Sequence, residues 1–275
     1  MRVAEWIQLT FVSLVTVAAW IRPVDPARER QLKIAALAAG AITTILAVRF
    51  TIPFFSTPSS SVVRDWLPAA LLLVPYWQIG QFFRSPNQNL QERLAALDRF
   101  LFAIPIQHPA RKRLGTALAL YLELAYLIAY PLIPLGLAVL YGAGLRHHAD
   151  QYWAAVLVAT YVCLAVTPFV QALPPRMLAD YITFDIPPTK IRALNQWILR
   201  RSSIQAITFP SAHVAASMAA SLVLLAFVPW VGLVFTWLAL SIAVAAVVGG
   251  YHYAADVLLA MLIVVLVFLG LRWLW

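Results

Sequence analysis

The feature that most constrains this chain is a series of apolar runs, each 15 to 28 residues long, that recurs along its whole length. A helix rises about 1.5 Å per residue, so runs of this length approach or exceed the roughly 30 Å of a bilayer core. Lipid offers no partner for unpaired backbone groups, and a chain that enters it repeatedly must pair those groups internally, as a helix does. The runs therefore predict an all-α, polytopic membrane helix bundle.

The composition agrees with this class and excludes a soluble domain. The 275 residues are 63% hydrophobic and only 11% charged, with a mean hydropathy of +0.82. The formal net charge is +9, and a basic excess in the loops either suits anionic lipid head groups or simply sets the topology. We expect the lipid bilayer as a partner, and no nucleic acid. The single cysteine, Cys163, cannot form a disulfide within the chain.

The pattern predicts about eight transmembrane helices. The expected spans are residues 6–21, 34–48, 66–83, 114–141, 152–173, 210–228, 233–248 and 254–275. The first span is as short as a signal peptide, but its flanks make a poor cleavage site, so we predict a retained helix. A loop rich in Ser, Thr and Pro ends at Ser61. It divides the chain into an N-terminal helix pair with its linker, residues 1–61, and a catalytic domain, residues 62–275.

Two stretches outside the spans are long and polar. Residues 93–106 have the spacing of an amphipathic helix that lies in the membrane interface rather than crossing it. Residues 174–208 are expected to be a loop, the longest one beside a motif. Its basic residues are Arg176, Lys190, Arg192, Arg200 and Arg201.

One acidic residue, Glu123, lies inside an expected span. It shares a helix face with Tyr126 and Tyr130, three and seven positions further on. An ionisable group within a membrane span is a functional candidate by default, although it can also simply hydrogen-bond to a neighbouring helix. Both interpretations are kept.

The stretch from Thr208 to Asp256 places three reactive groups at the starts of two spans. His213 begins one span, His252 and Asp256 begin another, and no charged residue lies between His213 and His252. A turn at residues 229–232 would return the chain to the membrane face from which it came. Both histidines are therefore expected at the same face.

This arrangement suits phosphate chemistry. Ser211 is a plausible cap for the helix that carries His213, and the free N–H groups of its first turn favour an anion. His252 and Asp256 are four positions apart, so a carboxylate on one ring nitrogen of His252 would leave the other nitrogen free to attack. A second histidine could protonate the leaving oxygen. The plainer alternative is two interfacial histidines with an aspartate bonded to loop backbone.

The motifs F-P-S-A-H at 209–213 and Y-H-Y-A-A-D-V at 251–257 resemble P-S-G-H and H-x-x-x-D of the type 2 phosphatidic acid phosphatase superfamily. Within it, LDRFLF at 97–102 and LELAYLIAYPLIP at 122–134 resemble signatures of the branch that includes inositol phosphorylceramide synthases. The similarity spans roughly residues 66–270. It implies a six-helix phosphatase-like core and a lipid phosphate substrate.

The resemblance also implies roles for individual residues. His252 would be the nucleophile that forms a phosphohistidine, Asp256 its orienting partner, and His213 the acid for the leaving group. We expect phosphate or substrate contacts from Arg176, Ser211, Ala212, Tyr251 and Glu123. No group of histidines has the spacing of metal ligands, so neither a metal nor another cofactor is expected.

The chain departs from the family pattern at several cationic positions. Thr167 and Pro174 stand where the first motif has Lys and Arg, Ala245 and Ala246 replace the Ser-Arg of the third motif, and Ala212 replaces a glycine. The synthase branch tolerates such losses. They therefore favour a head-group phosphotransferase with an acceptor alcohol, and they leave open a simple phosphatase or a non-catalytic lipid-binding or transport relative.

The lost cations leave Arg176 as the expected phosphate ligand. It alone lies beside the first-motif position, after a rigid Pro-Pro, and its planar fork matches two phosphate oxygens. We predict that Arg176 contacts the pocket of the two histidines, whereas Arg200 and Arg201 are peripheral. A channel or transporter is disfavoured, because the ionisable groups gather at one interface rather than at the midplane.

The charge distribution leaves the orientation in the membrane open. The loops on the expected side of the site carry fifteen of the 20 lysine and arginine residues, which by the positive-inside rule favours the cytoplasm. The family resemblance favours the outer or lumenal face. We expect an integral protein of a bacterial cytoplasmic membrane, with either orientation.

Overall fold

The computed structural model describes residues 1–22, 27–51, 58–101, 112–178 and 184–273. The described helices are α1 Val3–Ile21, α2 Ala27–Thr51, α3 Pro58–Leu71, α4 Leu73–Gly80, α5 Gln88–Leu101, α6 Thr116–Gly142, α7 Ala149–Val166, α8 Lys190–Ser202, α9 Ala212–Phe227, α10 Pro229–Val248 and α11 Ala254–Arg272. Three short 3-10 turns are η2 Arg146–His148, η3 Thr167–Phe169 and η4 Pro175–Met177. Two-residue strands, β1 Lys112–Arg113 and β2 Phe184–Asp185, pair in parallel. The expectation of an all-α polytopic bundle is confirmed.

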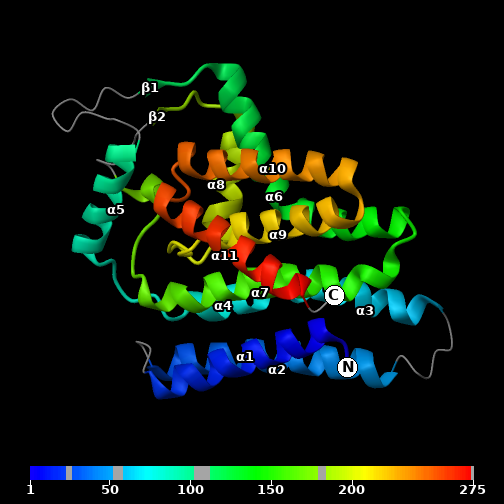
Figure 1. The fold of residues 1–275 in the computed structure, drawn as a ribbon. Helices are drawn as coiled ribbons and strands as arrows, with labels where there is room; N and C mark the ends of the chain where they lie inside the picture. Colours follow the sequence, from blue (N-terminus) through cyan, green and yellow to red (C-terminus); the bar gives the residue numbers. More distant parts are fainter. Residues whose placement is uncertain (23–26, 52–57, 102–111, 179–183, 274–275) are drawn as a thin grey trace.

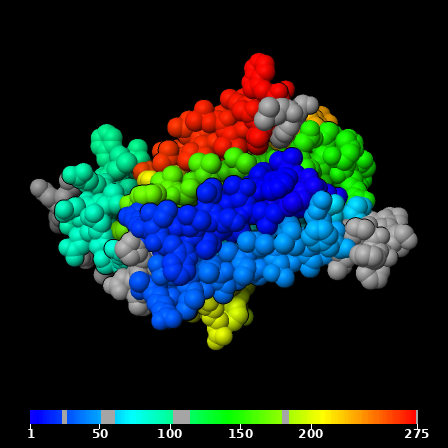
Figure 2. Space-filling view, turned by 90° about the horizontal axis from the view of Figure 1, so that it is seen from below, coloured from blue at the N-terminus to red at the C-terminus, as the bar shows by residue number. Residues whose placement is uncertain are grey.

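The long helices lie side by side, with α9 at the centre of the bundle (Figure 1). Helix α9 contacts α6, α7, α10 and α11, and its small residues allow these close approaches. Helices α1 and α2 form a layer along one side, which lies in front in the view of Figure 2. Helix α5 lies at one end of the bundle with its axis across the others.

Within the described residues, six helices are long and apolar enough to cross a membrane: α1, α2, α6, the segment Arg146–Phe169 that contains α7, α10 and α11. The two other predicted spans correspond to α9, which is shorter, and to the consecutive helices α3 and α4. Large apolar side chains on the outer helices are exposed, such as Trp237 on α10 and Leu266 on α11. These surfaces suit contact with lipid tails.

The span predicted at residues 66–83 is broken between α3, which ends at Leu71, and α4, which begins at Leu73, just before Pro75. A proline ring clashes with the carbonyl four residues before it, which here belongs to Leu71, the last residue of α3. The N-terminal pair packs against the rest of the bundle, since α1 contacts α4 and α7. Residues 52–57 of the expected linker lie outside the described residues, and the division at residue 61 stays a prediction.

The turn predicted at residues 229–232 is wrong, because these residues form the first turn of α10. Proline is favoured at the first helical position, where its missing N–H is not needed, and the chain reverses at Val228 instead. A side chain on Gly232 would lie 2.3 Å from the backbone of Leu225. This glycine therefore allows α9 and α10 to pack closely. Because the chain reverses between these two helices, both histidines lie at one end of the bundle.

Residues 174–208 are not simply a loop, which corrects the sequence interpretation. They contain α8, whose N-cap Thr189 accepts a hydrogen bond of 3.1 Å from the backbone N–H of Arg192. Asn195 and Leu199 are buried one turn apart on the same helix face. Helix α8 packs against α6, which brings its basic residues next to the end of the bundle where the histidines lie.

Candidate active site

His252 and Asp256 meet as predicted, although His252 lies just before the helix rather than inside it. Helix α11 begins at Ala254 with Tyr253 as its N-cap. Nδ1 of His252 lies 3.2 Å from Oδ2 of Asp256, and the same carboxylate oxygen accepts the backbone N–H of Tyr253 at 3.2 Å. A proton on Nδ1 satisfies this contact and leaves Nε2 of His252 with an available lone pair.

The backbone before His252 is folded into a tight turn at the end of α10. Gly250 has φ of +72°, which favours glycine. The turn lets the backbone N–H groups of Tyr251 and His252 both donate to the carbonyl of Ala246 at 2.9 Å. The carbonyl of Gly250 accepts the N–H of Arg176 at 2.7 Å. The main chain just before His252 is thereby tied to the segment that carries Arg176.

His213 lies in the first turn of α9, opposite His252. Ser211 caps this helix through a hydrogen bond from the N–H of Val214 to its side chain, which confirms the predicted cap. The ring centroids of His213 and His252 are 6.1 Å apart. Among the described residues, Nδ1 of His213 is buried without a hydrogen-bond partner. The two imidazoles therefore lie near each other, close to the starts of α9 and α11.

Aromatic side chains from α6 surround these histidines. Tyr126 stacks on Tyr251 with centroids 3.9 Å apart, and it lies 6.0 Å from the ring of His213. Tyr130 meets His213 edge to face at 5.5 Å. The face shared by Glu123, Tyr126 and Tyr130 therefore points at the site, as its spacing indicated.

Glu123 is buried and holds several groups around the site at once. Its Oε1 forms an ion pair with Arg192. Its Oε2 accepts hydrogen bonds from the hydroxyl of Tyr251 at 2.6 Å and from the side-chain amide of Asn195 at 2.7 Å. The interpretation of Glu123 as a hydrogen-bonding group is thus confirmed, since it bonds the neighbouring helix α8 and also the residue before His252. Its contact with substrate stays a prediction.

The hydroxyl of Tyr251 remains a donor in this environment. Burial is the main cause that raises the pKa of Tyr251 far above its ordinary value, and the carboxylate of Glu123 raises it further. The cations of Arg192 and Arg176 oppose this rise only in part. A protonated Tyr251 therefore links Glu123 to the turn that carries His252.

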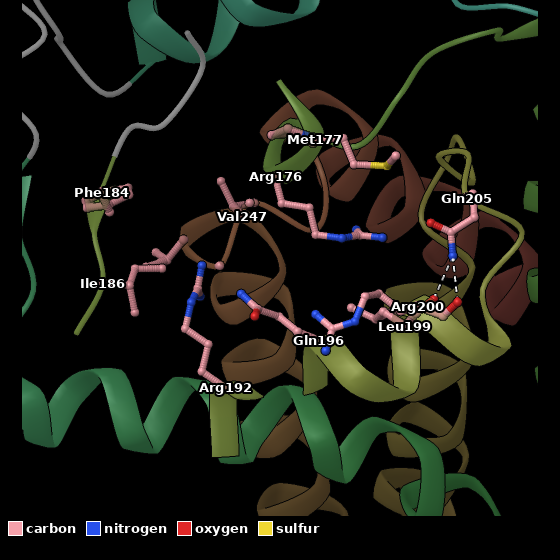
Figure 3. A pocket seen from close by; sticks show the side chains of 14 residues that line it. Arg176, Met177, Phe184, Ile186, Arg192, Gln196, Leu199, Arg200, Gln205 and Val247 are labelled. Carbon is pink, nitrogen blue, oxygen red and sulfur yellow. Dashed lines mark hydrogen bonds between the residues drawn. The ribbon is translucent and has the colours of Figure 1, made fainter. Parts of the chain in front are cut away.

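A cavity of about 480 Å³ opens beside the turn at Gly249 and Gly250. We call it the polar cavity, because three arginines and two glutamines lie among the apolar residues that line it: Arg176, Arg192, Arg200, Gln196 and Gln205. Figure 3 shows Arg176 reaching into it from one wall, with Arg192, Gln196 and Arg200 extending from α8. Neither Arg176 nor Arg200 forms an ion pair within the described part of the chain. Like charges that gather in a concave space favour an anionic ligand.

The sequence analysis expected Arg176 at the pocket and both Arg200 and Arg201 at its periphery, and the structure differs for Arg200. Arg200 lines the same cavity as Arg176 and is not peripheral to it, whereas Arg201 stacks on Trp197 at 5.2 Å. The guanidinium carbon of Arg176 lies 5.8 Å from the ring centroid of Tyr251, next to His252. Contact of Arg176 with the phosphate stays a prediction.

A second cavity, of about 240 Å³, is almost entirely apolar and adjoins His213. It lies between α3, α4, α6, α7, α8 and α9, and Leu199 lines both cavities. Its walls include Leu72, Tyr130 and Ala216. One side of the site is therefore polar and cationic, and the other is apolar.

The positions of the missing family cations are filled by structural residues. Ala245 and Ala246 are buried at the end of α10, and Ala212 is buried at the start of α9. The hydroxyl of Thr167 accepts the N–H of Phe209 at 3.2 Å and so ties the end of α7 to the segment before His213. Within the described ranges, no group of three or more His, Cys, Asp or Glu side chains could hold a metal ion.

Sequence reasoning missed two site-supporting residues, Asn195 and Asp98. Asn195 lies on the buried face of α8. The helical pattern of residues after Thr189 was the sequence signal that could have identified it. Asp98 is a buried acid on the otherwise apolar inner face of α5. That position in the predicted amphipathic helix was the available signal.

A family model described as the PAP2 superfamily matches residues 92–270. The chain belongs to the PAP2 superfamily. The match begins within α5 and includes both histidines, Asp256 and Arg176. Membership in the PAP2 superfamily supports a phosphatase-like phosphoesterase that acts on lipid phosphates in a bilayer. No curated protein and no solved structure matches the chain.

Proposed function

We propose that this protein cleaves the phosphate ester of a membrane lipid through a phosphohistidine on His252. The observation that carries the proposal is the meeting of His252, Asp256 and His213 at one end of a membrane bundle. A nucleophile oriented by a carboxylate, with a second imidazole nearby, is the arrangement that two-step phosphoryl transfer requires.

In the first step, Nε2 of His252 attacks phosphorus, and the bond from phosphorus to the leaving oxygen breaks. His213 donates a proton to that oxygen, so the lipid alcohol departs neutral. In the second step, His213 takes a proton from water or an acceptor alcohol, which attacks phosphorus, and the phosphorus–nitrogen bond breaks. Asp256 keeps the proton of His252 on Nδ1 throughout.

The surroundings of the histidines support a lipid as substrate. The apolar cavity adjoins His213, the proposed acid, and can receive the hydrocarbon next to the leaving oxygen. The first-turn amides of α9 and the guanidinium of Arg176 supply positive potential for the phosphate oxygens. Ser211 and Ala212 act here through the backbone at the start of α9.

A head-group phosphotransferase of the inositol phosphorylceramide synthase type is the second candidate. The polar cavity favours it, because about 480 Å³ exceeds what a single phosphate needs. Gln196 and Gln205 on its walls offer amide donors and acceptors to hydroxyl groups. An acceptor alcohol or a polyol head group would fit this chemistry.

The deciding experiment measures product from a lipid phosphate in detergent, with and without added alcohols. Release of inorganic phosphate by the wild-type protein, absent in His252→Ala, would establish the phosphoesterase. Diversion of phosphate into a new ester by inositol, glycerol or a choline-type alcohol would establish transfer. If the wild-type protein neither releases nor transfers phosphate from any lipid phosphate tested, the proposal of an enzyme is contradicted. A lipid-binding or transport relative is then favoured.

A further inference from the structure

Helix α5 carries a buried carboxylate that contacts the start of the helix with the catalytic aspartate. Asp98 is 1% exposed. Its Oδ1 and Oδ2 accept the backbone N–H of Ala254, at 3.0 and 3.2 Å. Ala254 is the first residue of α11, and its N–H is one of the four that a helix leaves without an internal partner.

Two carboxylates therefore hold consecutive backbone N–H groups at the entry to α11. Asp256 accepts from Tyr253, and Asp98 accepts from Ala254. Asp256 belongs to α11 itself, whereas Asp98 comes from a helix 156 positions away along the chain. A negative charge near a helix N-terminus is also favoured by the helix dipole. The position of this first turn sets where the carboxylate of Asp256 meets His252.

Helix α5 is itself fixed to the other segments around the site. The side chain of Gln91 accepts the N–H of Leu173 at 2.9 Å, and the carbonyl of Leu173 accepts the hydroxyl of Tyr253 at 3.2 Å. Leu94 packs in one cluster with Ile207 and Tyr253. The inner face of α5 therefore contacts the segments before η4, before α9 and before α11.

We infer that Asp98 is a positioning residue, through which helix α5 fixes the first turn of α11 and thereby aligns Asp256 with His252. The inference rests on the proposed function, in which these two residues act as a pair. A burial role alone would need only an apolar residue at position 98, because a buried carboxylate is costly unless its hydrogen bonds are made. The acid at this position is explained by the N–H group that it holds.

The first test compares Asp98→Asn with Asp65→Asn. Asp65 is also a buried carboxylate, but it pairs with Arg2 and Arg146 at the opposite end of the bundle. We expect Asp98→Asn to lower kcat on a lipid phosphate about tenfold or more, with KM within about twofold, because misalignment acts on the transition state. Asp65→Asn should lower the melting temperature and leave kcat within about twofold.

A second measurement does not depend on activity and so separates this inference from the proposed function. Hydrogen–deuterium exchange of the segment 249–260 should be faster in Asp98→Asn than in the wild type, and unchanged in Asp65→Asn. If no lipid phosphate is turned over but this exchange difference appears, the proposed function fails and the positioning role stands.

Asp98→Glu keeps the charge and moves it by one methylene, so its kcat should lie between those of the wild type and Asp98→Asn. If Asp98→Asn does not fold, the kcat of Asp98→Glu alone tests the positioning role of Asp98. The inference is overturned if segment 249–260 exchanges at the wild-type rate in folded Asp98→Asn, or if kcat of folded Asp98→Glu and Asp98→Asn stays within about twofold of wild type.

Discussion

The hydroxyl of Tyr251 donates a hydrogen bond of 2.6 Å to Oε2 of Glu123, across 128 positions of the chain. The same carboxylate pairs with Arg192, which lines the polar cavity. One buried acid in α6 thus connects the residue before His252 with a cation of helix α8. The wall of the cavity and the turn before His252 are therefore held by the same carboxylate.

Because Glu123 makes several of these contacts and Tyr251 only one, we expect substitution of Glu123 to destabilise the protein more than substitution of Tyr251. Glu123→Gln should lower the free energy of unfolding by about 3 kcal/mol, because removing one partner of a buried ion pair leaves the other uncompensated. Tyr251→Phe should cost only about 1 kcal/mol, since it removes one hydrogen bond and keeps the ring stacking. Thermal unfolding in detergent measures both changes.

The matched control for Tyr251→Phe is Tyr121→Phe. Tyr121 lies on the same helix as Glu123, and its hydroxyl is 2.5 Å from Oγ of Ser241. The Tyr121→Phe variant should lose a similar single hydrogen bond without a change in kcat. Tyr251→Phe should lower kcat, because it releases the turn before His252. Equal kcat in the two variants would contradict the connection.

The nucleophile assignment predicts that His252→Ala loses turnover by about 10³-fold or more while the protein remains folded. Asp256→Asn should be severe but less complete, because the imidazole remains and only its orientation and charge partner are lost. Phosphate release by monodisperse protein measures both. His148→Ala is the control and should keep its turnover, because His148 stacks on Phe227 at the opposite end of the bundle. Substantial turnover by His252→Ala would show that His252 is not the nucleophile.

The acid assignment predicts a dependence on the leaving group. His213→Gln should lower kcat for an alkyl or lipid phosphate by about 10²- to 10⁴-fold, because its leaving alkoxide needs a proton. For p-nitrophenyl phosphate, whose leaving phenolate is stable, the loss should be less than about tenfold. Equal losses on the two substrates would show that His213 acts elsewhere in the reaction.

The phosphate-ligand assignment predicts that Arg176→Lys lowers kcat about 10- to 100-fold, because an ammonium cannot make the paired bonds of a guanidinium. Arg200→Ala should mainly raise KM, since Arg200 lines the cavity at its exposed side. Arg201→Ala is the control, because Arg201 stacks on Trp197. Wild-type kcat in Arg176→Lys would leave the phosphate to Arg192, Lys190 or the amides of α9.

Local relationships in the sequence were sufficient to predict much of the fold and of the reactive groups. The apolar runs predicted the helices, because a bilayer requires backbone pairing within each segment. The contact of His252 with Asp256 and the cap by Ser211 also followed from spacing, since interactions between residues three or four positions apart are set by the geometry of a helix start. None of these depends on how the helices pack.

The errors arose where local signals had two interpretations. Residues 174–208 were polar and contained Pro-Pro, and this concealed the amphipathic pattern of α8 after Thr189. Pro229 and Gly232 were read as a turn, although a proline is equally suited to begin a helix and a glycine to admit a close neighbour. The packing of α10 on α9 decided between these alternatives.

The sequence alone was sufficient to predict the class of the protein, most of its long apolar helices and the pair formed by His252 and Asp256. The contacts between distant segments around that pair became known only from the folded chain: Glu123 with Tyr251, Asp98 with Ala254, and Arg176 with Arg200 in one cavity. The physical reason is that the first set of contacts is fixed by helical periodicity, whereas the second set depends on how helices far apart in the chain pack against one another.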